Sequence, residues 1–595
     1  MVWMKKMTEP NGQQLEDFKK LQLITYEAEK AAELAFRQKL LNIYAEARQD
    51  KETISSDWNT FIAFLRGQQW PKRRPSYKVS AVINFLIENI ERKTALLSDA
   101  KPIPNIKPRN DKLQDTADIL NTIINSIFEN SSFGQANTDL VEHSQVFGSG
   151  FIGTLFDADG DNHGGDVSVV SYDPRAVYVD PLVRKSYLLH EAEYVIIEDI
   201  WPLTKAKDVF PERADMFKAD AGLERFRDDK QGFFTTMRNK IFKSPQDEVV
   251  KSEIPRVYVR EFWLKDRSVG ENDKPRFKNK ARKVCMVGEV IADDGDNPYN
   301  DGMHPIDMLI WHTDFNTSWG WGDVELLRNP QELQNKIIAT VIENISLMSN
   351  AIWIGDTDAL EKQDWNKLNN EPGTYVKKRI GRELRREPGM PLPEYVLRTL
   401  DYVGISTEKI SGMVDVMRGI RTGQVSSGVG IESLQLMAQA LIRLRARALE
   451  ALHERVGRKL VSRIFQFYPP KKIMDVLMET NRDVTQLEAI TSELLKDISE
   501  RKGDEWTNIS FKIEPGSSLG LAQTQRRIES MKLREMNVID NRALLEDLEY
   551  PHRETVLKRT EEKLTDAGEA EMGAGDASRG TRFPVQEGAS PVGRT

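Results

Sequence analysis

The stretch MRGIRTGQVSSGVGIES, residues 417–433, has the glycine-rich composition of a loop that could hold phosphate groups. A nucleotide-binding loop of the Walker type needs G-x-x-x-x-G-K-[ST], because the lysine reaches the β- and γ-phosphates and the hydroxyl group binds Mg²⁺. Here GQVSSGVG continues to Ile431, Glu432 and Ser433, and the Walker pattern occurs nowhere else in the chain. The sequence therefore argues against an ATP- or GTP-hydrolysing enzyme.

A second stretch, DADGDNHGGDVS at residues 157–168, imitates a calcium-binding loop. Asp157, Asp159 and Asp161 occupy the first, third and fifth positions. The sixth position needs glycine for a sharp turn and holds Asn162, and the twelfth needs a bidentate glutamate and holds Ser168. These two failures favour a solvated hairpin turn.

Other catalytic and metal-binding patterns are missing from the sequence. The seven histidines form neither an HExxH motif nor a paired zinc spacing, and no G-x-S-x-G motif occurs. The single cysteine, Cys285, lies in an apolar segment and is expected to be a core residue that cannot form an internal disulfide. We expect no catalytic residues, no metal and no cofactor.

The segment YVKKRIGRELRREPG, residues 375–389, is locally basic in a chain whose net charge is −8. A solvated surface turn and a partner-docking patch are both consistent with it. Proteins that grip nucleic acid are usually basic overall, so any contact with DNA here should be local and weak. The sequence contains no run of eighteen apolar residues, so it predicts no membrane-spanning helix. The six basic residues are Lys377, Lys378, Arg379, Arg382, Arg385 and Arg386.

The spacing of apolar residues predicts a mainly helical α+β protein. Residues 333, 337, 341, 345 and 348 should form the apolar face of one helix. A very long helix over 431–468 should end at Pro469 and carry seven basic residues against three acidic ones, on a solvent-facing side. The tail from Thr565 is rich in Gly, Ala and Ser and should be disordered. Helices are predicted over 13–66 (in two parts), 82–98, 113–129, 134–146, 204–210, 223–240, 392–416, 522–536, 541–547 and 553–564, and strands over 150–156, 166–172, 194–200, 256–263, 283–291 and 506–518.

The order of these segments resembles that of the portal proteins of tailed double-stranded DNA bacteriophages. The likeness covers most of the chain, and its specificity lies in the order of the segments rather than in one motif. The resembling segments are FIAFLRGQQWP, VINFLIENIERKTALLSDAKPIPNIKPR, VFGSGFIGTLFD, VSVVSYDPRAVYVDP, WGWGDVELLRNPQELQNKIIATVIENISLM and EPGSSLGLAQTQRRIESMKLREMNVIDNRALLEDLEYPHRETVLKR.

The resemblance implies a head-to-tail connector: a ring of twelve subunits at one capsid vertex, around a central channel for DNA packaging, retention and ejection. It implies a place in the virion, with assembly in the host cytoplasm. Implied partners are double-stranded DNA bound transiently and without sequence specificity, the terminase large subunit, the major capsid and scaffolding proteins, and head–tail adaptor proteins. By the same resemblance, residues 1–323 form the N-terminal wing, 324–349 the first stem helix, 350–391 the clip, 392–416 the second stem helix, 417–430 the tunnel loop, 431–515 the long helix and C-terminal wing, 516–564 the crown, and 565–595 the tail.

Site residues follow from the same likeness. Arg418, Arg421 and Gln424 in the tunnel loop would contact DNA, and arginines can touch phosphates without reading bases. The basic patch of the clip would dock terminase and later the tail adaptor. One alternative is a structural head–tail or scaffolding protein without DNA contact. A less favoured one is the terminase large subunit, which requires a Walker loop.

Overall fold

The computed structural model falls into two compact units, residues 1–518 and 519–595, which we describe separately. The described residues are 12–71, 74–75, 78–99, 101–129, 131–158, 160, 165–220, 254–270, 273–349, 352–360, 368, 375–387, 391–413, 440–479, 493–501, 505–514, 520–548, 556–557 and 559. The predicted helix over 223–240, most of the one over 553–564, and the tail from Thr565 lie outside them.

Two antiparallel sheets form the framework of the larger unit. Strand β2 (Ser149–Asp157) pairs with β3 (Asp166–Tyr172) and with β9 (Ile306–Ile310), which confirms the predicted hairpin over 150–172. The second sheet has the order β4-β5-β6-β7-β8. Its strands are β4 (Val177–Val179), β5 (Tyr194–Pro202), β6 (Arg256–Lys265), β7 (Ala281–Val287) and β8 (Val290–Asp296).

The single strand predicted over 283–291 is wrong. The chain turns at Gly288, whose φ of 62° is strained for residues with a side chain, and β7 and β8 pair with each other on either side of it. Apolar residues before and after the turn gave the segment the pattern of one continuous strand. The short helix α6 (Leu203–Val209) follows β5 as predicted.

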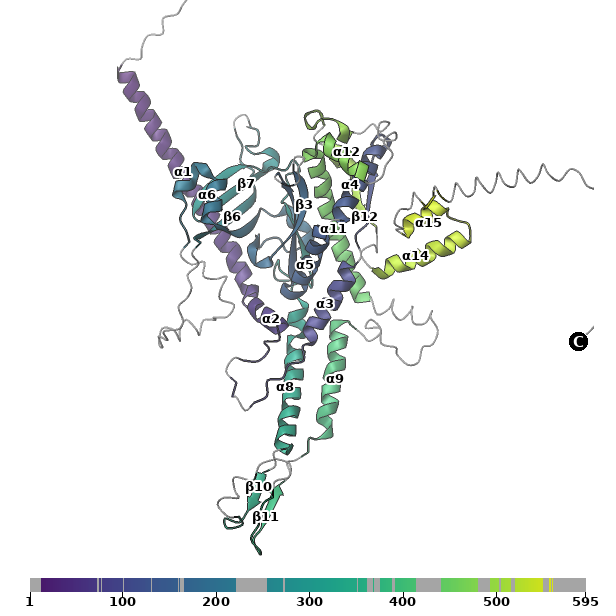
Figure 1. The fold of residues 1–595 in the computed structure, drawn as a ribbon. Helices are drawn as coiled ribbons and strands as arrows, with labels where there is room; N and C mark the ends of the chain where they lie inside the picture. The colour runs from purple at the N-terminus through teal and green to yellow at the C-terminus, as the bar shows by residue number, and fades with distance from the viewer. Residues whose placement is uncertain are drawn as a thin grey trace, which may run out of the picture. The chain divides into compact units, whose positions relative to one another are not determined.

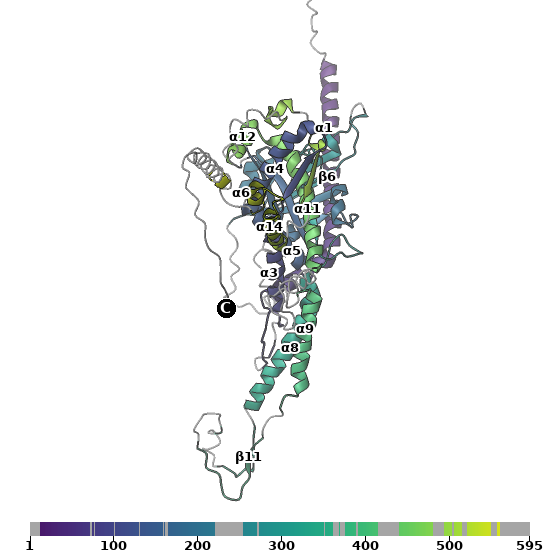
Figure 2. The ribbon, with the colours of Figure 1, turned by 90° about the vertical axis from the view of Figure 1, so that its right-hand side faces the viewer.

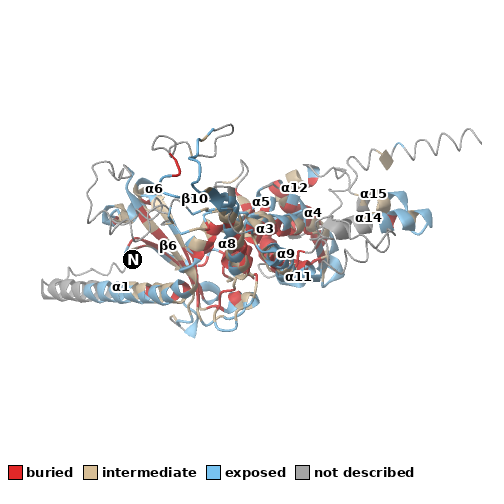
Figure 3. Ribbon diagram, turned by 90° about the horizontal axis from the view of Figure 1, so that it is seen from below, coloured by how far each residue is buried: buried red, intermediate tan, exposed pale blue. Residues whose placement is uncertain are grey.

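The N-terminal helix α1 (Gly12–Ser55) and α2 (Trp58–Leu65) confirm the two-part helix predicted from residue 13. Leu40 and Ala47 of α1 pack against the five-stranded sheet, and the Lys51 ammonium donates to the carbonyls of Arg175 and Val177 at 2.6 and 2.7 Å. Buried residues gather around β6, α5 and α3 in Figure 3.

A helical layer lies beside the sheets (Figures 1 and 2). It contains α3 (Phe85–Ser98), α4 (Gln114–Glu129), α5 (Ser131–Phe147), α11 (Ala440–Phe467) and α12 (Pro470–Glu479). Strands β1 (Pro104–Pro108) and β12 (Ile509–Ile513) pair antiparallel next to it. The long helix ends before Pro469 as predicted, whereas α12 was not predicted. The expected start of the long helix at 431–439 is outside the described residues.

Helices α8 (Asp323–Ser349) and α9 (Glu394–Ser411) run side by side away from the sheets (Figures 1 and 2). Strands β10 (Ile352–Gly355) and β11 (Leu384–Glu387) pair at the far end of these helices. The helix predicted over 392–416 stops early, because Gly412 adopts the left-handed conformation (φ 75°) that ends many helices.

The smaller unit contains a helix pair, α14 (Gly520–Glu535) and α15 (Asn541–Asp547), close to the predicted bounds. Arg534 joins the two by donating from Nε to the Asn541 side chain at 2.6 Å. None of the described helices of the chain is long and apolar enough to cross a membrane.

Candidate DNA-contacting and partner-docking surfaces

Helix α8 turns its apolar side chains outward. Five residues were predicted as its apolar face, and three of them, Leu333, Ile345 and Met348, are exposed in the single chain. Its buried side instead carries Gln331, Gln334 and other polar residues. Helix α9 also exposes large apolar side chains, so the two helices together present an apolar surface to their surroundings. The exposed set is Leu333, Ile342, Ile345, Leu347 and Met348 on α8, and Tyr395, Leu397, Tyr402, Ile405 and Ile410 on α9.

An amide network fixes the buried side of α8 near its start. The Gln331 side chain accepts from the Phe85 backbone N–H at 2.9 Å and donates to the Ile83 carbonyl at 2.7 Å. It also donates to Asn335, which in turn donates to Gln69. These bonds satisfy groups that would be costly to bury unpaired. The network therefore ties α8 to the segment that leads into α3.

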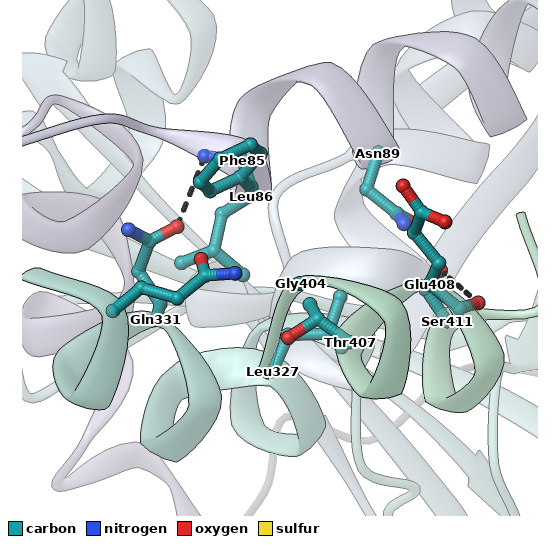
Figure 4. A pocket seen from close by; sticks show the side chains of 10 residues that line it. Phe85, Leu86, Asn89, Leu327, Gln331, Gly404, Thr407, Glu408 and Ser411 are labelled. Atoms are coloured by element: carbon teal, nitrogen blue, oxygen red, sulfur yellow. Dashed lines mark hydrogen bonds between the residues drawn. The ribbon is translucent and has the colours of Figure 1, made fainter. Parts of the chain in front are cut away.

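Gln334, one turn beyond Pro330, faces a small cavity of about 40 Å³ between α3, α8 and α9. Figure 4 shows Asn89, Gln331 and Thr407 around it, with Gly404 of α9 at its edge. The Oε1 atom of Gln334 and the Oδ1 atom of Asn89 are buried, and neither has a hydrogen-bond partner among the described residues. At this cavity the two projecting helices are incompletely packed, and both polar and apolar residues line the space.

A second polar cluster lies where α8 begins. Asp323, the first residue of α8, is buried and binds Lys93 of α3, with 2.8 Å between Nζ and Oδ2. His312 donates from Nε2 to the other carboxylate oxygen at 3.2 Å. Hydrogen bonds from His312 and the nearby Lys93 charge outweigh burial and hold the pKa of Asp323 at about 2.

Arg445 of α11 extends this cluster. Its guanidinium donates to the Trp311 carbonyl and meets Nδ1 of His312 at 2.6 Å. Because arginine only donates, Nδ1 must accept, which places the imidazole proton on Nε2, facing Asp323. A chain of side chains therefore connects the start of α8 to the start of α11.

The predicted DNA-contacting residues Arg418, Arg421 and Gln424 lie outside the described residues. The two ends of their segment are described. A side chain at Gly412 would come within 2.7 Å of the Leu441 side chain, so the chain leaves and re-enters the fold at nearly one point. Both residues line a cavity of about 60 Å³ beside Asp323 and Arg445.

All six basic residues of the predicted docking patch are exposed. Arg385 and Arg386 lie on β11, opposite Ile354 and Trp353 of β10. Arg382 forms a loose ion pair with Asp358 at 3.7 Å, and Arg385 forms one with Glu387 at 3.4 Å. Exposed pairs of this kind contribute little, so the surface stays available to an acidic partner.

The solvent-facing basic side predicted for the long helix is wrong over its C-terminal half. Lys459 and Arg463 are buried, and Arg455 is mostly so. Lys459 pairs with Asp307 of β9 at 2.7 Å, and Arg463 lies over the Tyr299 ring at 4.0 Å. Burial lowers the pKa of Lys459, with Asp307 acting against it. Among the apolar residues of the described part of this helix, Leu441 and Leu444 are exposed, whereas Leu452, Val456 and Leu460 are buried.

Cys285 is buried in β7, as predicted, and burial raises the pKa of its thiol to about 12. The calcium-like stretch forms the β2–β3 connection, and Asp159 and residues 161–164 of it are outside the described residues. Where the structure describes the chain, no three His, Cys, Asp or Glu side chains gather in a way that could hold a metal ion.

The sequence did not single out Lys93, His312, Asp323 or Gln334. Lys93 lies on α3, Asp323 and Gln334 lie on α8, and His312 follows β9. The contacts of Lys93 with Asp323 and of His312 with Arg445 join segments that are far apart in the chain. The one available signal was WGWGD at residues 319–323, where two glycines allow the chain to approach the β2 corner closely just before α8. Because the two glycines fix the position of the chain just before α8, they also fix the position of the next residue, Asp323.

The sequence model of the family described as Phage P22-like portal protein matches residues 42–574, which is most of the chain. No curated protein matches the sequence.

Proposed function

The chain belongs to the phage P22-like portal protein family, whose members are structural virion components rather than enzymes, and we propose that twelve copies of it form a ring around a DNA channel at one capsid vertex. In this proposal the ring admits DNA during packaging, retains it, and releases it at ejection. The force for packaging would come from a separate terminase.

The observation that carries the ring is the outward apolar surface of α8 and α9. Ile345, Leu347 and Tyr402 are 57, 69 and 71% exposed. A soluble monomer rarely leaves such a series of large apolar side chains in water. In a closed cyclic oligomer, each helix pair would bury these side chains against the pairs of its two neighbours.

The family relationship also supports a division of labour along the chain. Residues 1–323 and 431–515 would form the wing, 324–349 and 392–416 the stem, 350–391 the clip, 417–430 the tunnel loop, and 516–564 the crown. In support, α8 and α9 cover most of the two stem segments, and β10–β11 occupies the end where a clip would be. The end at Ser411 shortens the second stem helix relative to this division.

Two surfaces would meet partners. The tunnel loop would touch DNA phosphates through Arg418 and Arg421, with Gln424 nearby, in transient contacts that do not depend on sequence. The exposed basic patch of the clip would dock terminase and then a head–tail adaptor, while the wing and crown would meet capsid and scaffolding proteins. The alternative is a ring that joins head to tail without touching DNA.

Electron microscopy of the purified protein, classified for rotational symmetry, tests the proposal. We expect closed rings with twelvefold symmetry and a central channel wide enough for a duplex. Well-folded monomers at micromolar concentration would count against the ring, and a channel too narrow for a duplex would favour the alternative.

A further inference from the structure

Ile380 is the most exposed large apolar side chain of the described residues, at 104% of its reference area. It lies just before β11, in the β10–β11 part of the chain at the far end of α8 and α9 (Figure 1). Single exposed apolar residues are common on protein surfaces, so exposure alone does not mark a binding site. What sets Ile380 apart is the backbone that presents it and the charges around it.

A β-turn holds Ile380 at its corner. The Arg382 N–H donates to the Arg379 carbonyl at 3.4 Å, so Ile380 and Gly381 are the two central residues of the turn. Gly381 has a φ of 81°, the value that a type II turn requires at its third residue. Glycine is therefore explained by the turn. Isoleucine is not, because turn corners are usually filled by Gly, Pro, Asn, Asp or Ser.

Hydrogen bonds tie both ends of this turn to the segment that follows β10. On one side, the Arg379 N–H donates to the carbonyl of Ala359, a buried residue, at 3.0 Å. On the other side, the Asp356 N–H donates to the Glu383 carbonyl at 3.0 Å, and the Glu383 N–H donates to Oδ2 of Asp356 at 3.0 Å. Strand β11 begins directly after Glu383. The turn is thus part of a hydrogen-bonded frame, which presents Ile380 in a defined position.

Exposed positive charges lie on both sides of Ile380 in the chain. Lys377, Lys378 and Arg379 precede it, and Arg382 follows the turn. Arg382 has its loose, exposed pair with Asp358, whereas the other three form no ion pair with any described residue. An apolar side chain among basic ones is complementary to a pocket that is apolar at its bottom and acidic at its rim.

We propose that Ile380 is the anchor of the basic patch: it enters an apolar pocket of an acidic partner protein, while the basic residues contact carboxylates at the rim of that pocket. The inference rests on the proposed function, which assigns partner docking to this end of the chain. It adds the source of specificity, because positive charge alone would attract any acidic surface. A turn that is already fixed loses little conformational entropy on binding, so the burial of Ile380 contributes directly to affinity.

Binding of purified rings to the purified terminase large subunit and head–tail adaptor of the same phage tests the anchor. Ile380→Ser should weaken binding of at least one of them about 10–100-fold, and Ile380→Leu should keep most of the affinity. Salt should not reduce this loss, because apolar burial is not screened, whereas the loss caused by reversing Lys377, Lys378 and Arg379 should shrink as salt rises. The matched control is Ile498→Ser, the same change at an exposed isoleucine outside the clip, which should bind like the wild type.

Gly381 offers a second pair of variants that leave Ile380 in place. A side chain at Gly381 would meet no atom within 4 Å, so only the backbone conformation decides what the position accepts. Asparagine tolerates a positive φ and a β-branched residue does not. Gly381→Asn should therefore bind nearly as well as the wild type, whereas Gly381→Val should displace the corner of the turn and weaken binding about as much as Ile380→Ser.

The outcomes separate this inference from the proposed function. Wild-type rings that bind neither protein would refute the docking role of the clip. Wild-type rings that bind, with equal binding by Ile380→Ser, would overturn the anchor and leave docking intact. Equal binding by Gly381→Asn and Gly381→Val would overturn the role of the turn. Loss of the ring itself in Ile380→Ser would also overturn the proposal, because a second copy of the chain would then be what covers Ile380.

Discussion

Lys93 and Asp323 form a buried ion pair that joins α3 to the first residue of α8, with 2.8 Å between Nζ and Oδ2. The pair is nearly inaccessible to solvent, and His312 binds the second carboxylate oxygen. Ion pairs in such positions are weak evidence of net stabilisation, but removal of one partner leaves an uncompensated buried charge.

We therefore predict that Lys93→Met lowers the free energy of unfolding by about 3–5 kcal/mol. Urea unfolding of the purified protein measures it. The matched control is Arg92→Met, because Arg92 is the next residue of α3 and forms an exposed pair with Glu88 at 3.0 Å. That change should cost less than about 1 kcal/mol. Equal losses in the two variants would show that the buried pair has no special role.

The same carboxylate predicts a pH dependence. The folded pKa of Asp323 is about 2, below its ordinary value of 3.8, so ionised Asp323 stabilises the fold above the unfolded pKa. This contribution should be lost as the pH falls from about 4 to about 2, and it is on the order of 2 kcal/mol. The stability difference between wild type and Asp323→Asn should therefore shrink over that interval. A difference that stays constant would contradict the assignment.

Assembly should depend on the exposed apolar side chains of α8. Leu347→Glu places a charge where the proposed neighbour packs, so the ring should dissociate or fail to form, while the fold of the monomer is kept. Ser346→Glu adds the same charge at the adjacent exposed residue and should disturb assembly less. Native mass measurement and circular dichroism distinguish loss of the ring from loss of the fold. Intact rings of Leu347→Glu would place the interface elsewhere.

Charge reversal tests the clip patch. Lys377→Glu, Lys378→Glu and Arg379→Glu together should abolish packaging and leave ring assembly intact, because these residues are exposed and away from α8 and α9. A control with the same charge change outside the clip, Lys101→Glu with Lys107→Glu and Lys112→Glu, should package normally. Packaging that survives the clip reversal would identify the patch as an ordinary solvated surface.

Two kinds of change in the proposed tunnel loop, residues 417–430, should cause two different defects in DNA packaging. A duplex carries one charge per about 1.7 Å of its axis, so rigid, closely fitted arginines would hold it strongly and stall it. Arg418→Ala with Arg421→Ala should still give rings but retain packaged DNA poorly. Gly423→Pro with Gly428→Pro should stiffen the loop and slow packaging. Genome length and retention in particles measure both, and normal values in both variants would mean that the loop only turns the chain.

Much of the fold was predictable because it depends on local patterns. Helix α1, the β2–β3 hairpin and the first projecting helix follow from apolar spacing and from clear breaks at Gly and Pro. The β7–β8 turn was missed because Gly288 is a single residue inside an apolar run. Helix α12 was missed because Pro470 begins it, directly after another proline that ends α11.

The candidate sites were less predictable, because they depend on contacts between distant segments. Lys459 has the pattern of a solvent-facing lysine until β9 places Asp307 against it, about 150 residues away in sequence. The same holds for Gln334, which lines a cavity completed by α3 and α9. The exposed basic patch of 377–386 was foreseen as a charge cluster, and its partner remains a proposal.

The burial of Cys285 makes this chain a convenient background for site-selective labelling. Its thiol is the only one in the sequence, and with its pKa raised to about 12 it is almost entirely protonated at neutral pH. Thiolate, not thiol, attacks maleimide-type reagents, so the native protein should stay unlabelled. A cysteine introduced at an exposed position such as Thr399 would then carry a fluorophore or spin label alone. Distances between labels on neighbouring subunits could be followed without removing any native residue.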